Sequence, residues 1–129
     1  MIRVNDEMKA LLKSAMWVLA TADSSGVPNA VPIHFNSILD DTHLMLVDNF
    51  MNKTIANIQA NPQVSISVWD STSGYQFKGR ASLEKSGANY ELAVELVKDK
   101  PFKPKGVVIV EVDSIYLTTP GPNAGNKVE

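Results

Sequence analysis

Extended segments occur in consecutive groups along this 129-residue chain, rather than singly between helices. The hydrophobic pattern predicts a helix, three strands, a helix, two strands, a helix and a final strand, in that order. Strands that follow one another directly favour an antiparallel sheet over a parallel one. Six strands with few helices to cover them would leave exposed sheet edges, and closure into a small barrel removes those edges. We therefore expect a mainly β (α+β) antiparallel barrel with about three short helices.

The predicted elements account for most of a single domain, residues 1–129. Helices are expected at 5–15, 52–61 and about 87–99, with Asn52 and Ser86 as the caps of the second and third. Strands are expected at 16–22, 27–38, 44–47, 64–69, 75–83 and 107–112. Pro28 and Pro32 lack an N–H donor, so the run 27–38 should lie at a sheet edge or be irregular on the side where the prolines point. The tail at 120–129 has no apolar periodicity, and we expect it to be loose or held at an interface with a partner.

The bulk composition excludes several classes of function. A net charge of −2 gives no electrostatic basis for nucleic-acid binding or for attraction to an anionic membrane. The chain has no cysteine, which rules out disulfides and thiolate chemistry and suits a cytoplasmic protein. Neither a signal peptide nor a run of about 20 apolar residues is present. No spacing of histidines and carboxylates predicts a metal site.

One stretch combines a buried strand with a helix start that could hold an anion. The apolar run 44–47 is followed by a short loop and by Asn52, Lys53 and Thr54 at the beginning of the predicted helix. A helix N-terminus offers unpaired N–H groups and positive potential, to which these residues add an ammonium and a hydroxyl. Together these groups are suited to binding a phosphate. On this stretch alone, a capped surface helix with a solvated lysine is the commoner arrangement.

The two histidines differ in their surroundings. His43 follows Asp40 and Asp41 in a predicted turn, where a solvated surface role is expected. His34 lies on the polar face of the run 27–38, beside Pro32 and Asn36. Histidine titrates near neutral pH, so His34 is the only candidate for a catalytic proton-transfer group, and the catalytic residues otherwise stay unknown.

Three segments, taken together, resemble the FMN-binding split-barrel family, which has the pyridoxamine 5′-phosphate oxidase-like fold. They are 31–37, 46–58 and 74–81, and their order and spacing carry the likeness. The resemblance extends from about Leu11 to Tyr116, and it is strongest to the small FMN-binding proteins of the family. The resemblance implies a six-stranded antiparallel split β-barrel. It also implies a homodimer with FMN at the subunit interface.

The resemblance also implies which residues contact the cofactor. Along the flavin these are Pro32, Ile33, His34, Phe35 and Asn36, with Leu46 and Val47 beside it. At the phosphate they are Asn52, Lys53 and Thr54, and Gln76 matches a position that reaches the edge of the isoalloxazine ring. A phosphate dianion at a helix start with one lysine is well compensated, so elementary electrostatics agrees with this assignment.

Two departures argue against a true pyridoxamine 5′-phosphate oxidase. Asn52 stands where a second basic phosphate ligand is expected, and the sequence stops after 126–129 with no ending rich in Arg and Trp. We therefore expect a cytoplasmic FMN-dependent oxidoreductase with an unknown small substrate or redox partner. A nicotinamide or a protein is the possible electron donor. The alternatives are an electron carrier without its own substrate and a binder of F420 or haem on the same barrel.

Overall fold

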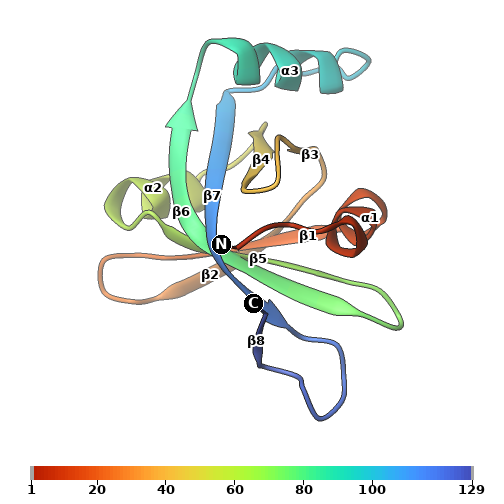
Figure 1. Cartoon of the computed structure of the whole chain (residues 1–129). Coiled ribbons are helices and arrows are strands. Elements are labelled where there is room, and N and C mark those ends of the chain that lie inside the picture. The colour runs from red at the N-terminus through yellow and green to blue at the C-terminus, as the bar shows by residue number, and fades with distance from the viewer. Residues whose placement is uncertain (1, 129) are drawn as a thin grey trace.

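The structure is a computed structural model, and it describes residues 2–128. Its elements are α1 (Asp6–Ser14), β1 (Trp17–Ala22), β2 (Pro28–Ile33), β3 (Asn36–Ile38), β4 (His43–Asp48), α2 (Lys53–Ala60), β5 (Gln63–Trp69), β6 (Gly74–Glu84), α3 (Ala88–Leu96), β7 (Gly106–Leu117) and β8 (Lys127–Val128). Three helices accompany a single curled sheet, in which β6 and β7 are the longest strands (Figure 1). The expected mainly β fold is confirmed.

All strand pairs are antiparallel, in the order β2-β1-β5-β6-β7-β4-β3, with β8 added beside β7. The two edge strands, β2 and β3, are consecutive in sequence and are joined only by His34 and Phe35. So short a connection brings the two ends of the sheet together, and the sheet therefore curls into a barrel that is split between β2 and β3. The prolines of β2 lie at an edge, as expected.

Residues 2–128 form eight strands rather than six, for two physical reasons. The expected run 27–38 divides because the Asn36 side chain donates from Nδ2 to the Ile33 carbonyl (2.8 Å), which closes a bend between the strands. The tail also returns to the sheet, where Lys127 and Val128 pair with Tyr116 and Ile115. This pairing places the end of the tail in the sheet of its own subunit.

The main core fills the barrel and is closed by α1. Alternate side chains of the central strands point inward, among them Leu19, Ile66, Phe77 and Ile115, each fully buried. Helix α1 adds the apolar stripe of Met8, Leu11 and Leu12. The indole N–H of Trp17 donates to the Leu12 carbonyl (2.7 Å), which fixes α1 against β1.

A second, smaller core lies under α3, where Met45, Val47, Val107 and Ile109 pack on Ala93. Strand β4 is thus buried on both faces, with Leu44 and Leu46 in the main core and Met45 and Val47 in the second. The predicted cap of α3 was wrong. Gly87, not Ser86, precedes the helix, and its φ of +95° belongs to the left-handed region that glycine adopts most easily.

Candidate functional site

A cavity of about 480 Å³ opens beside the short connection between β2 and β3. Its size falls within the roughly 300–1,000 Å³ of small-molecule and cofactor sites. The walls come from β2, the connection, β4, the loop 49–52, the start of α2 and the loop after α3. The lining residues are Asn29, Val31, Pro32, Ile33, His34, Phe35, Val47, Asn49, Phe50, Met51, Asn52, Lys53, Thr54 and Phe102. None of them is acidic, and Lys53 and His34 are the two that can carry positive charge.

The connection between the edge strands is held from both sides. The Phe35 carbonyl accepts from the Val47 amide (2.9 Å), and the Ile33 carbonyl accepts from Asn36 (2.8 Å). His34 is exposed between these anchors. The wall formed by residues 33–35 is therefore fixed by β4 while its histidine stays accessible.

Helix α2 presents an uncapped N-terminus to the cavity. Asn52 occupies the cap position with φ −133° and ψ −75°, and its side chain makes no capping hydrogen bond. Helix α1 differs, because there the side-chain oxygen of Asn5 accepts from the Met8 amide (2.9 Å). The first N–H groups of α2 thus lie without a side-chain acceptor beside Lys53, in a first turn that contains no acidic residue. Donors of this kind suit an anion.

Buried hydrogen bonds fix the position of this helix start. Thr54 is 3% exposed, and its hydroxyl oxygen accepts from Nδ2 of Asn29 (3.1 Å) in β2. The same amide lies 3.4 Å from the hydroxyl of Thr21, which also accepts from Nδ2 of Asn57 (3.0 Å). The first turn of α2 is thereby tied to the hairpin of β1 and β2.

Asp48 and Lys105 order the loop between β4 and α2. The Asp48 carboxylate accepts from the Met51 amide (2.9 Å), and Lys105 lies 3.7 Å from it while donating to the Met51 carbonyl. Burial raises the pKa of the Asp48 carboxyl above its ordinary 3.8, and the Met51 amide and Lys105 oppose that rise. The loop also carries Asn49, whose Oδ1 is buried at the cavity with no hydrogen-bond partner. An unpaired acceptor of this kind suits a ligand that brings an N–H or O–H donor.

Three phenylalanines form an aromatic side of the cavity. Phe102 packs edge-on against Phe50 (5.1 Å between centroids) and against Phe35 (6.2 Å). Phe50 is 76% exposed, unusually high for so apolar a side chain. Lys100 lies 6.0 Å from the Phe35 ring. A cavity that combines an apolar side with an uncapped, acid-free helix start is suited to a ligand with a flat ring system and a charged end.

Eight of the eleven predicted cofactor-binding residues line this one cavity: Pro32, Ile33, His34, Phe35, Val47, Asn52, Lys53 and Thr54. The other three lie elsewhere. Asn36 faces the neighbouring hollow by α1, and Leu46 is fully buried in the main core. Gln76 lies in β6, three strands away from β2 in the sheet.

Sequence reasoning missed six lining residues: Asn29, Val31, Asn49, Phe50, Met51 and Phe102. Of these, Phe50 and Met51 carried a usable signal, because both are apolar residues in a loop.

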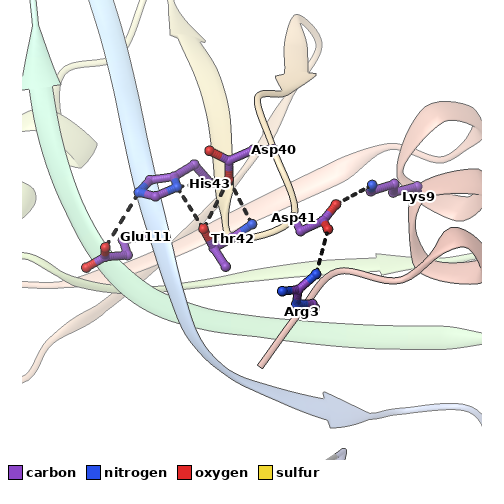
Figure 2. Close-up of polar contacts among 7 residues, drawn as sticks. All are labelled: Arg3, Lys9, Asp40, Asp41, Thr42, His43 and Glu111. Carbon is purple, nitrogen blue, oxygen red and sulfur yellow. Dashed lines mark hydrogen bonds and ion pairs between the residues drawn. The ribbon is translucent and has the colours of Figure 1, made fainter. Parts of the chain in front are cut away.

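The other polar cluster of note lies around the start of β4 (Figure 2), whereas Val47, near the end of that strand, lines the cavity. His43 was expected to be solvated. Its side chain is 34% exposed and bridges Asp40 (2.9 Å) and Glu111 (3.5 Å). The Thr42 backbone N–H and His43 lower the pKa of Asp40 to about 2. Asp41 pairs with Lys9 and with Arg3 (3.5 Å), which joins this turn to the N-terminal segment.

Two kinds of feature are absent from residues 2–128. No group of three or more His, Asp or Glu side chains could hold a metal ion. No helix is long and apolar enough to cross a membrane.

Known proteins match this chain over most of its length. Residues 4–119 match the family described as pyridoxamine 5′-phosphate oxidase. The uncharacterised protein MJ0282 of Methanocaldococcus jannaschii is 36% identical, over 98% of this chain and 89% of that protein. The crystal structure of HupZ from Group A Streptococcus is similar with a TM-score of 0.84 and 32% identity, over 94% of this chain and 98% of that one.

Two more distant structures share the fold. An FMN-binding protein from Syntrophomonas wolfei aligns with a TM-score of 0.72 and 16% identity, over 81% of this chain and 78% of that one. An F420 reductase aligns with a TM-score of 0.65 and 21% identity, over 83% of this chain and 94% of that one.

Proposed function

We propose that this chain, which belongs to the FMN-binding split-barrel (pyridoxamine 5′-phosphate oxidase-like) family, binds FMN without a covalent bond and acts as an oxidoreductase. The substrate is a small molecule or a redox partner. The observation that carries the proposal is the uncapped, acid-free start of α2, which opens into a cavity with an aromatic side. A phosphate dianion supplies the acceptor that the first turn of this helix lacks.

The residues present fit FMN at both ends. Lys53, the Thr54 hydroxyl and the first N–H groups of α2 would hold the phosphate, and Asn52 lies beside them. The wall formed by Pro32, Ile33 and Phe35 would flank the ring system, and the unpaired Oδ1 of Asn49 would accept from a donor on the ligand. Bound flavin supplies electron or hydride transfer, while the protein supplies orientation and electrostatics. His34 is accessible for proton exchange with a substrate.

The outer face of the sheet supports a homodimer. This outer face consists of two cross-strand rows: Pro32, Val18, Ser67, Gln76 and Tyr116; and Ala30, Ala20, Ser65, Lys78 and Ser114. Most of these side chains are small, and Lys78 is the only charged one. The Ser65 Oγ is already buried without a partner. A surface with so little charge is suited to packing against a second copy.

Gln76 would serve the partner's cofactor rather than its own. Pro32 and Gln76 lie in the same cross-strand row but three strand spacings apart, which is about 14 Å. A glutamine side chain does not span that distance. Packing two outer faces together would bring Gln76 of each subunit toward the cavity of the other, which reconciles the family position with this geometry.

The first experiment is the visible spectrum of the purified protein, followed by reconstitution with FMN. We expect the two absorption bands of flavin. A colourless protein that FMN cannot reconstitute would refute the proposal. Stopped-flow reduction by NADH or NADPH then separates an enzyme that uses a nicotinamide donor from an electron carrier.

The second experiment tests whether Lys53 contacts the phosphate of FMN. Lys53→Ala should weaken FMN binding about tenfold or more, because it removes one charge-assisted contact, and should leave riboflavin binding nearly unchanged. Lys13→Ala, which removes a lysine at the end of α1, is the matched control. Equal losses for FMN and riboflavin would mean that Lys53 does not touch the phosphate.

F420 is the second candidate ligand, because its phosphodiester would suit the same helix start and one structural neighbour is an F420 reductase. The same spectrum discriminates it, since a deazaflavin gives one band where FMN gives two. A Soret band would instead indicate haem. Whether FMN or F420 is bound, the protein can act either as an enzyme or as an electron carrier.

A further inference from the structure

Four buried or half-buried polar side chains form a connected chain beneath the first turn of α2. Asn29 donates from Nδ2 to the hydroxyl oxygens of Thr54 (3.1 Å) and Thr21 (3.4 Å). Asn57 donates from Nδ2 to Thr21 (3.0 Å). Thr54 and Thr21 are 3% and 4% exposed. Two of the four, Asn29 and Thr54, also line the cavity.

The direction of these hydrogen bonds decides what Thr54 can offer a ligand. An amide N–H can only donate, whereas a hydroxyl has one hydrogen to donate and two lone pairs. With Asn29 as its donor, the Thr54 oxygen is an acceptor in this pair, and its own hydrogen is left for another partner. Within residues 2–128 that hydroxyl makes no other hydrogen bond. It is therefore a buried hydroxyl at the edge of the cavity, and its hydrogen has no acceptor within residues 2–128.

We propose that Asn29 is a positioning residue that makes the Thr54 hydroxyl a donor to the terminal phosphate of the cofactor. This inference rests on the proposed function. A phosphate dianion can only accept, so the chain Asn29 N–H to Thr54 O–H to phosphate oxygen runs in one direction, and each bond polarises the next. The terminal hydroxyl of riboflavin can accept or donate, so it gains less from a fixed donor. Asn29 thereby contributes to selection of the phosphorylated flavin without touching the phosphate.

A double-mutant cycle tests this role. Dissociation constants for FMN and for riboflavin are measured by flavin fluorescence quenching for the wild type, Asn29→Leu, Thr54→Val and the double variant. We expect Asn29→Leu to weaken FMN binding about fivefold or more and riboflavin binding less than about twofold. In the Thr54→Val background, Asn29→Leu should have almost no further effect on FMN, because it acts through a hydroxyl that is already gone.

Asn57→Leu is the matched control, since Asn57 contacts Thr21 but not Thr54 and lies outside the cavity. It should leave the ratio of FMN to riboflavin affinity unchanged. Asn29→Ala replaces Asn29→Leu in the cycle if thermal denaturation shows that the larger side chain prevents folding.

Three results would overturn the inference. Full additivity of the two substitutions would show that Asn29 does not act through Thr54. An unchanged affinity ratio in Asn29→Leu, with a wild type that prefers FMN, would refute the role of Asn29 alone and leave the proposed function intact. A wild type that binds neither flavin would refute the proposed function and this inference together.

Discussion

Asp48 is a buried carboxylate at the end of β4, 6% exposed, and it organises the loop that leads to α2. Because burial raises the pKa of this carboxyl above 3.8, the folded state favours its neutral form more than the unfolded state does. The stability that this group contributes is therefore fully present below pH 3.8. It is lost as the pH rises through the raised pKa.

We expect Asp48→Asn to remove this pH dependence, because the amide keeps the acceptor for the Met51 N–H and cannot ionise. The free energy of unfolding of the variant, relative to the wild type, should rise as the pH increases above 3.8 and then become constant. Urea denaturation between pH 3 and pH 8 measures the difference. Asp99→Asn, at an exposed site in the loop after α3, controls for the loss of one negative charge. A difference that falls with increasing pH would contradict the prediction.

Residue types alone predicted the side of the cavity at the start of α2 better than they predicted its aromatic side. Lys53 and Thr54 could be found because a strand, a short loop and a helix start are adjacent in sequence. Phe102 could not, because it reaches the cavity from a loop about forty residues beyond α2, and only the folding of β6, α3 and β7 brings it there. Asn29 was missed because the role proposed for it depends on a contact with Thr54, which the sequence does not reveal.

At the scale of elements, strand β6 depends on a glycine at its bulge. The pairing of β6 with β7 shifts register between Lys78 and Gly79. A Cβ on Gly79 would clash with the backbone carbonyl of Glu111, a part of β7 that cannot move aside as a flexible side chain could. Glycine is therefore required for close approach of the two longest strands.

Gly79→Ala should lower the free energy of unfolding by about 3 kcal/mol, because the added methyl group forces the two strands apart. Ser82→Ala, at an exposed position of the same strand, should change it by less than about 0.5 kcal/mol. Urea denaturation of both variants gives the comparison. Similar stabilities for the two variants would show that the bulge tolerates a side chain.

Element types were largely predictable from the sequence, whereas element ends and pairings were less so. Helices α1 and α2 and strand β5 occupy the expected segments because their apolar periodicity is regular. The run 27–38 was expected as one strand, since no proline or glycine marks the bend that Asn36 closes. The pairing of β1 with β5 was not predictable, because about forty residues separate them and no local pattern records the contact.

At the scale of the whole molecule, the outer face is the test of assembly. Ala20 lies near the middle of the outer face, paired with Ala30 on one side and Ser65 on the other. In the proposed dimer an arginine there would bury an unpaired charge, which is strongly unfavourable. We expect Ala20→Arg to convert the protein to a monomer.

Light scattering after gel filtration measures the mass, and FMN titration accompanies it. The monomer should bind FMN at least about tenfold more weakly, a loss of about 1.4 kcal/mol, because Gln76 of the partner is removed. Gln59→Arg on the exposed side of α2 is the control and should leave both quantities unchanged. A dimer that survives Ala20→Arg would place the interface elsewhere.

The uncapped start of α2 has a consequence for how the chain could be improved by design. Asparagine is among the best capping residues, so a change that let the Asn52 side chain cap its own helix would stabilise the empty protein by about 1 kcal/mol, the usual value of a cap. That same acceptor would occupy the N–H groups that an anion needs. A sequence optimiser that scores the isolated fold would therefore favour a change that disables it. Under the proposed function, the stability forgone at this one helix end keeps the N–H groups of α2 open to the phosphate of the cofactor.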